Sequence, residues 1–173
     1  MTVVTALHTG FRMSELLSLT WHDVDFPRCV IAVRAAYAKS GESRSIPMNS
    51  VLLETLRAMQ GDSTKDGAVF CTSKGSPYRD FRTTFRRVVR RAGIEDFTFH
   101  DLRHCFASRL VMAGVDLPTV QALMGHKNVT MTMRYTHLSA NHKQQAVALL
   151  EPFAAKVPAI FPTGRLANAG VPL

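Results

Sequence analysis

Residues 97–137 constrain the fold more than any other stretch, because they combine helical patterns with strong stop signals. Apolar residues recur at helical spacing over 101–113 and 117–124, and a glycine follows each run. Asn128 or Thr130 can cap a third helix, which we expect to reach about residue 137. The stretch therefore predicts three consecutive helices joined by short turns.

Four polar side chains in this stretch are placed so that they can converge. His100 and Arg103 are three positions apart, so they share one face of the first helix. His126 follows a glycine just beyond the second helix, and Tyr135 lies in the third. We expect these four groups to meet at one site.

The remaining chain predicts an α+β fold, namely a mostly α-helical domain with one small antiparallel sheet. A β-branched run over 29–36 and a second run over 44–48 predict a hairpin whose turn holds Lys39. Further helices are expected over 1–8, 14–21, 50–60, 78–92 and 141–153. We expect one domain over 1–156, followed by a tail over 157–173 that is flexible or docks on a neighbour.

The charge of the chain points to a polyanionic partner. The net charge is +8, and 15 of the 21 basic residues are arginine, whose fork of donors matches phosphate oxygens. This favours nucleic acid, although a basic surface kept for solubility is the alternative. The arginines for which we predict DNA contacts lie mostly on the 78–92 helix, and they are Arg44, Arg79, Arg82, Arg86, Arg87 and Arg90. The alternatives are a solvated face for the helix and a structural role for Arg44.

Disulfides, structural zinc and membrane spans are not expected. The three cysteines are widely spaced, and no apolar run approaches the roughly 18 residues that a membrane span needs. No leader pattern is present, so we expect a cytoplasmic protein. His100 and His104 form an HxxxH pair without further ligands at zinc spacing, so His104 is expected to pack or to donate or accept a hydrogen bond.

Tyr135 is the candidate nucleophile. A free phenol has a pKa near 10, so only about 0.1% is ionised at neutral pH, and closing that gap takes roughly 4 kcal/mol. His100 and His126 can take or hold a proton, while Arg12 and Arg103 are fixed cations that stabilise phenolate and phosphoryl oxygens.

Lys39 is the candidate general acid if the electrophile is a DNA phosphodiester. The leaving sugar alkoxide needs a proton, and a lysine at the tip of a hairpin can reach into the groove to supply it. Two guanidiniums can neutralise the charge for which other enzymes use a metal ion, so no metal or other cofactor is expected. The sequence also has no paired carboxylates for two metals and no P-loop.

These residues resemble the tyrosine recombinase, or phage-type integrase, family over about 1–153. The segments that carry the resemblance are, in order, TGFRMSEL at 9–16, KSGESRSIP at 39–47, HDLRH at 100–104, LMGH at 123–126 and YTH at 135–137. The resemblance implies a 3′-phosphotyrosyl intermediate at Tyr135 and strand exchange without metal or ATP. It also implies that Glu15 supports Arg12 and that protomers associate as a dimer or tetramer on double-stranded DNA.

The chain departs from the family pattern at its start, because Arg12 is only the twelfth residue. We therefore expect a catalytic domain without the N-terminal DNA-binding domain of the family. Two alternatives stay open: a helix-turn-helix-like regulator built on 115–137, and an inactive DNA-binding fragment. The target sequence, and the choice between integration, excision and resolution, are left open.

Overall fold

The computed structural model describes residues 1–38, 41–61, 67–72, 74–138 and 147–148. The chain divides into two units, Met1–Ser139 and Ala140–Leu173, and the fold below is that of the first. Lys39 and the predicted boundary at 156 lie outside the described residues. So does most of the predicted helix over 141–153, of which residues 147 and 148 are helical.

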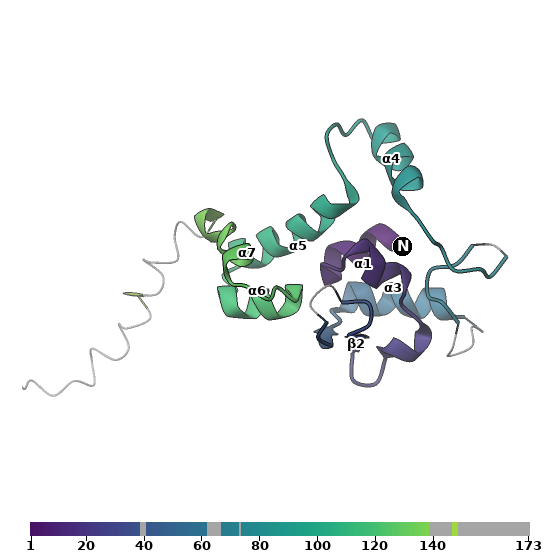
Figure 1. The fold of residues 1–173 in the computed structure, drawn as a ribbon, viewed down its shortest axis with the longest axis horizontal. Coiled ribbons are helices and arrows are strands. Elements are labelled where there is room, and N and C mark those ends of the chain that lie inside the picture. The colour runs from purple at the N-terminus through teal and green to yellow at the C-terminus, as the bar shows by residue number, and fades with distance from the viewer. Residues whose placement is uncertain (39–40, 62–66, 73, 139–146, 149–173) are drawn as a thin grey trace, which may run out of the picture. The chain divides into compact units, whose positions relative to one another are not determined.

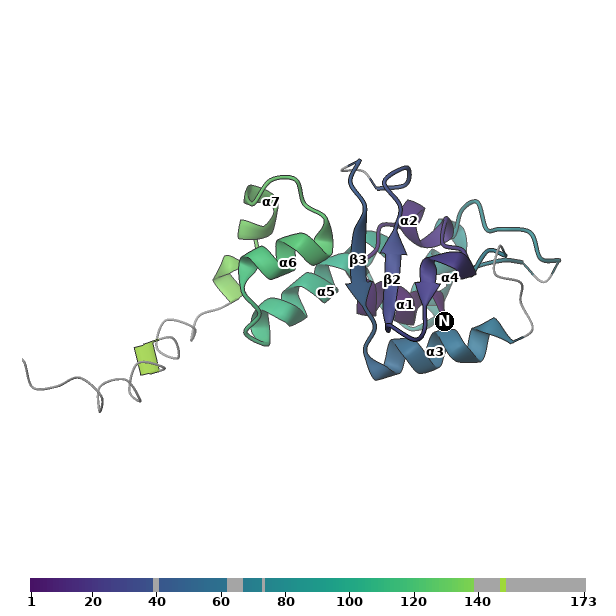
Figure 2. The same cartoon turned by 90° about the horizontal axis from the view of Figure 1, so that it is seen from below.

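The described part of the first unit is mostly helical, with one three-stranded sheet (Figures 1 and 2). Its helices are α1 (Thr2–Thr9), α2 (Met13–Leu17), η1 (Trp21–Asp23), α3 (Ser50–Gln60), α4 (Arg82–Arg91), α5 (Phe99–Met112), α6 (Leu117–Met124), α7 (Thr130–Met133) and η2 (Thr136–Leu138). The antiparallel sheet has the order β1 (Val24–Asp25), β2 (Val30–Val33), β3 (Arg44–Pro47). The predicted α+β class is confirmed. None of the described helices is long and apolar enough to cross a membrane.

Three helices show how the observed helix bounds compare with the predicted ones. The Asn49 side chain accepts from the Leu52 backbone and caps α3, which spans the predicted residues 50–60. Helix α4 begins at Arg82, four residues later than predicted, so Arg79 lies before it; Asp80 accepts from the Arg82 backbone at 2.8 Å. The third helix of the opening stretch is also shorter than predicted, because α7 ends at Met133 and a separate 3₁₀ turn follows.

Helix α5 joins two apolar clusters. Its first turn places Phe99 and Leu102 in the larger cluster, which also holds the buried faces of α1, α2, α3, α4 and the sheet. Its later turns place Phe106 and Val111 in a smaller cluster with residues of α6 and with Tyr135. In Figure 1, α6 accordingly lies along the later turns of α5, and α1 lies at its beginning. Arg103 therefore lies where the two clusters meet.

Gly10 allows α1 to approach α5 closely. It ends α1 in the left-handed conformation, with φ of +64°, and a Cβ at this position would lie 2.4 Å from Cδ1 of Phe106. A larger residue would therefore meet both backbone strain and a clash with a buried ring. Gly10 therefore sets the path of the chain from the end of α1 to Arg12, two residues later.

We expect Gly10→Ala to lower the free energy of unfolding by about 2–4 kcal/mol, from left-handed strain plus overpacking. Gly93→Ala is the matched control, because Gly93 has φ of +67° and nothing within 4 Å of an added Cβ. The control should lose only the strain, about 1–2 kcal/mol. Urea unfolding measures the free energy of unfolding of both variants. Equal losses would show that the contact with Phe106 does not contribute to the cost of Gly10→Ala.

Candidate active site

One pocket brings together five of the six predicted catalytic residues. It has a volume of about 470 Å³ and lies among α2, α5, α6 and the segment around α7. Its lining residues are Arg12, His100, Arg103, His104, Met124, His126, Thr130, Met131, Arg134 and Tyr135. The predicted convergence of residues that are far apart in the sequence is therefore present, with Lys39 outside the described residues.

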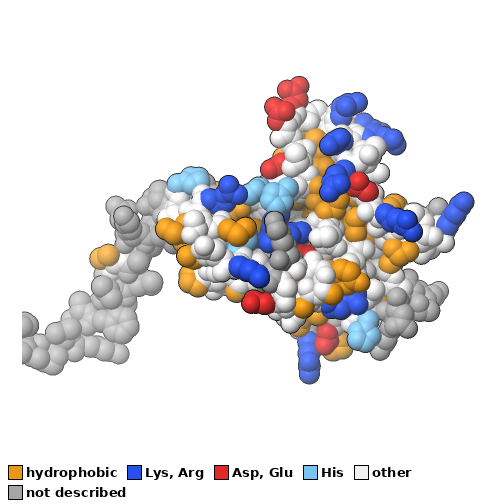
Figure 3. Space-filling view, in the orientation of Figure 1, with side chains coloured by type: hydrophobic (Ala, Val, Ile, Leu, Met, Phe, Trp, Pro, Cys, Tyr) orange, Lys and Arg blue, Asp and Glu red, His pale blue; other side chains and the backbone are white. Residues whose placement is uncertain are grey.

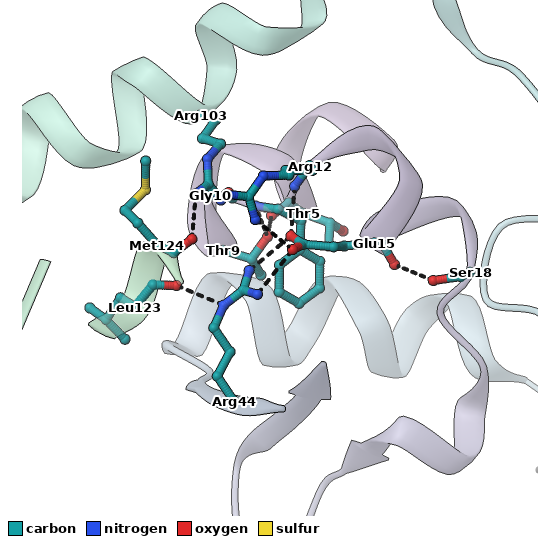
Figure 4. Close-up of polar contacts among 11 residues, drawn as sticks. Thr5, Thr9, Gly10, Arg12, Glu15, Ser18, Arg44, Arg103, Leu123 and Met124 are labelled. Carbon is teal, nitrogen blue, oxygen red and sulfur yellow. Dashed lines mark hydrogen bonds and ion pairs between the residues drawn. The ribbon is translucent and has the colours of Figure 1, made fainter. Parts of the chain in front are cut away.

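Arg103 is a buried cation held by two backbone carbonyls. It is 2% exposed, and its guanidinium donates to the Gly10 oxygen at 2.5 Å and to the Met124 oxygen (Figure 4). Burial, and then the charge of Arg12, lower its pKa to about 9, so the side chain still carries its charge at neutral pH. The same side chain thus holds α1 to α6 and provides positive charge to the pocket.

Glu15 lies between two arginines. Its carboxylate accepts from Arg12 Nη1 at 2.9 Å and from the Arg12 backbone at 2.8 Å, which is the predicted support of Arg12. Arg44 donates two further bonds to the same carboxylate, at 2.8 and 3.0 Å (Figure 4). Burial alone would raise the pKa of Glu15, but the bonds and charges of Arg44 and Arg12 outweigh it and lower that pKa. Glu15 is therefore a buried anion that orients Arg12.

The contacts of Arg44 favour its structural alternative over the predicted DNA contact. Besides its two bonds to Glu15, its Nε donates to the Leu123 oxygen at 3.0 Å, and its side chain is only 9% exposed. It therefore ties β3 to α2 and to the end of α6. The other arginines predicted to contact DNA are all exposed, and they are Arg79, Arg82, Arg86, Arg87 and Arg90. Basic side chains gather over α4 in the space-filling view (Figure 3).

His126 enters the pocket as a neutral imidazole. Its Nδ1 is 2.9 Å from Oγ1 of Thr132, a fully buried residue, and its backbone oxygen accepts from Gln121. Burial, and then the charges of Arg103 and Arg12, lower its pKa to about 4. At neutral pH it therefore offers hydrogen bonds to a ligand without adding charge.

The hydroxyl of Tyr135 is hydrogen-bonded to His104. Tyr135 is 5% exposed, and its Oη lies 2.6 Å from His104 Nδ1. Burial raises the pKa of Tyr135, and the charges of Arg134 and Arg103 oppose it, so the phenol is protonated in this state. The expectation that His104 packs or hydrogen-bonds is confirmed. That Tyr135 is the hydrogen-bond partner of His104 was not predicted. The available sequence signal was that His104 lies one helical turn after His100, on the same helix face.

His100 lies at the exposed rim of the pocket. Its ring packs edge-to-face on that of His104, with centroids 4.8 Å apart. Burial, and then the charges of His104 and Arg103, lower its pKa. Arg134, which also lines the pocket, was not predicted, because an exposed arginine beside a tyrosine has no distinguishing sequence signal.

Known proteins are similar to this chain in sequence and in fold. A sequence model of the phage integrase family matches residues 2–142. The integrase of Salmonella phage P22 is 34% identical over 165 residues, which cover 88% of this chain and 43% of that protein. The tyrosine recombinase XerA of Pyrococcus furiosus is 34% identical over 146 residues, covering 80% of this chain and 50% of that protein.

Two solved structures agree with these relatives. The Tn1549 transposon integrase in complex with transposon right end DNA superimposes with a TM-score of 0.71 at 28% identity, covering 84% of this chain and 57% of that one. The catalytic domain of bacteriophage HP1 integrase gives 0.68 at 29% identity, covering 91% and 84%. The chain belongs to the phage integrase family, and its fold is that of the tyrosine recombinase catalytic domain. It spans about half the length of the curated relatives named above.

We expect Glu15→Gln to destabilise the protein by about 3 kcal/mol, because it leaves Arg44 buried without its anion. The matched control is Arg28→Ala, which breaks an ion pair of 3.8 Å whose arginine side chain is 83% exposed. That loss should stay below about 0.5 kcal/mol. Chemical denaturation compares the two, and a small loss for Glu15→Gln would mean that water replaces the carboxylate.

We also expect acid to destabilise the fold through His126. Its folded pKa of about 4 lies below the unfolded value of 6.5, so the unfolded chain binds more protons in this window and stability falls as pH falls through it. His126→Asn can keep the hydrogen bond to Thr132. Between pH 7 and about 5, its free energy of unfolding should fall by about 1 kcal/mol less than that of the wild type, a value already reduced for the partial exposure of His126. His100 and His104 have the same sign, so part of the decline remains.

Unfolding curves at several pH values test this prediction. His22→Asn, at an exposed histidine outside the pocket, is the control and should follow the wild-type decline. If the free energy of unfolding of His126→Asn falls with pH as much as that of the wild type, His126 gains its proton without cost in the folded state.

Proposed function

We propose that the chain is the catalytic domain of a site-specific DNA recombinase that cleaves and rejoins DNA through Tyr135. The observation that carries this proposal is the shared pocket, in which the Tyr135 hydroxyl lies with Arg12, Arg103 and His126. Two cations beside a phenol suit attack on a phosphodiester, since both the nucleophile and the phosphoryl group develop negative charge. The family relatives named integrases and tyrosine recombinases support the same activity.

In this proposal the arginines and histidines have different tasks. Arg12 and Arg103 bind the scissile phosphate and keep their charge throughout. His126 and His100, whose pKa values are lowered, donate or accept hydrogen bonds at the phosphate as neutral groups. Tyr135 Oη forms the bond to phosphorus, and the 5′ oxygen leaves with a proton for which Lys39 stays the predicted donor. A 5′-hydroxyl of a second strand reverses these steps, so neither metal nor ATP is needed.

Double-stranded DNA is the proposed substrate and partner. The exposed arginines of α4 are available to contact phosphates, and the related Tn1549 integrase is bound to transposon DNA in its solved structure. Strand exchange requires two cleaved duplexes, so we propose association into a dimer or tetramer on DNA. The proposed compartment is the cytoplasm.

Covalent capture on DNA tests the activity. The substrate is a pool of nicked duplexes with randomised sequence, in which loss of the short strand beyond the nick traps any phosphotyrosyl product. Wild type should yield an adduct that survives denaturant and whose yield is unchanged by chelation of divalent metals. Tyr135→Phe should yield none, because it removes the attacking oxygen while keeping the ring in the smaller apolar cluster.

Tyr78→Phe is the matched control, since Tyr78 is 36% exposed and lies outside the pocket. It should react as wild type does. DNA binding by the wild type without any adduct would identify the chain as an inactive DNA-binding fragment. An adduct lost on chelation would contradict the metal-free mechanism.

A further inference from the structure

We infer that His104 is the general base of the cleavage step, taking the proton of Tyr135 as its oxygen attacks phosphorus. This assignment rests on the proposed function of the site. It concerns a residue outside the predicted catalytic set, and it differs from the expectation from the sequence that His100 or His126 takes that proton.

The geometry places His104 directly on the reacting atom. Its Nδ1 is 2.6 Å from Tyr135 Oη, within the range needed for direct proton transfer. Within the described part of the chain, His100 and His126 make no hydrogen bond to this oxygen. His126 Nδ1 instead faces Thr132, and His100 contacts His104 through its ring. The imidazole nearest to the phenolic proton is therefore that of His104.

The surroundings of His104 keep it able to accept a proton. The charged and titratable groups that act on it are His100, Asp101 and Arg103 of α5, with Arg134 and Tyr135 from the segment after α7. Burial, and then the charge of Arg134, lower its pKa, while Asp101 opposes them. The ring is thus neutral at pH 7, and with its hydrogen on Nε2 its Nδ1 lone pair accepts the phenolic O–H.

The cleavage step moves one proton and exchanges one P–O bond for another. The Tyr135 O–H proton moves to His104 Nδ1, the phenolate oxygen forms a bond to phosphorus, and the P–O5′ bond breaks with its electron pair leaving on the 5′ oxygen. That oxygen takes its proton from the general acid, for which Lys39 is predicted, or from water. In rejoining, the imidazolium returns its proton to the departing Tyr135 oxygen, as microscopic reversibility requires.

The hydrogen bond between His104 and Tyr135 could also serve only to hold the tyrosine ring in place. His104→Asn separates the two roles. An asparagine amide reaches about as far as the Nδ1 side of histidine and can accept the same hydrogen bond, but it cannot take a proton at neutral pH. A holding role would survive this substitution, whereas a base would be lost.

The experiment measures single-turnover adduct formation, from about pH 5 to pH 9, on a nicked duplex selected from the randomised pool. We expect His104→Asn to react about 100-fold or more slowly than wild type, within the range typical of general bases, and to lose the acid-side inflection of the wild-type pH profile. The exposed His22→Asn should retain both the rate and the inflection. A rate within about threefold of wild type with an unchanged profile would overturn the assignment.

Two further measurements test whether a slow variant has lost its base rather than its general acid or its fold. A substrate with sulphur at the 5′-bridging position leaves as a thiolate and needs no general acid, because thiols have pKa values near 8.5. It should not rescue His104→Asn, and rescue would mean that His104 acts on the leaving group instead. Added imidazole should restore His104→Ala, provided that this variant shows wild-type circular dichroism and DNA binding; no rescue in such a folded protein counts against the base.

The two proposals fail in different ways. Absence of adduct from wild type overturns both. Adduct that needs Tyr135 but forms at the wild-type rate in His104→Asn leaves the recombinase function standing and overturns only the role of His104.

Discussion

The buried guanidinium of Arg103 is the interaction on which the rest of the structure depends. A charge that is 2% exposed must be compensated, and here two backbone carbonyls, of Gly10 and Met124, accept from it. Both oxygens lie at the C-terminal ends of helices, where carbonyls lack partners within the helix and the helix dipole favours a cation. One side chain therefore satisfies the ends of α1 and α6 and fixes both helices on α5. This arrangement also positions the pocket, because Arg12 follows Gly10 by two residues and His126 follows Met124 by two.

Two glycines allow the chain to turn sharply beside Arg103. Gly10 and Gly125 adopt left-handed conformations, with φ of +64° and +61°. At Gly125 an added Cβ would lie 3.0 Å from Arg44 Nη1, so the arginine that ties the sheet to α6 also requires this glycine. Arg12 and His126, two of the predicted catalytic residues, each lie within two residues of one of these glycines.

Local signals predicted most of the fold, and long-range contacts account for what was missed. The predicted helices over α3 and α6 are confirmed, because their caps and stops lie within a few residues of each end. Strand β1 is too short to show alternation and exists only through its pairing with β2. In the site, convergence followed from helical spacing and from the family resemblance. Which imidazole meets the Tyr135 hydroxyl depends instead on how the segment after α7 returns to α5, since His100 and His104 share a helix face.

The charged groups around the pocket leave its arginines positive and its histidines neutral at pH 7. Glu15 is one anion among Arg12, Arg44 and Arg103, so excess positive charge faces the pocket and helps to keep its histidines neutral. In the proposed reaction, a phosphodiester bound to Arg12 and Arg103 would bring negative charge close to these imidazoles. Nearby negative charge raises the pKa of a histidine and makes it a stronger base. Substrate binding would therefore favour movement of the Tyr135 proton onto an imidazole only when a phosphate is in place to be attacked.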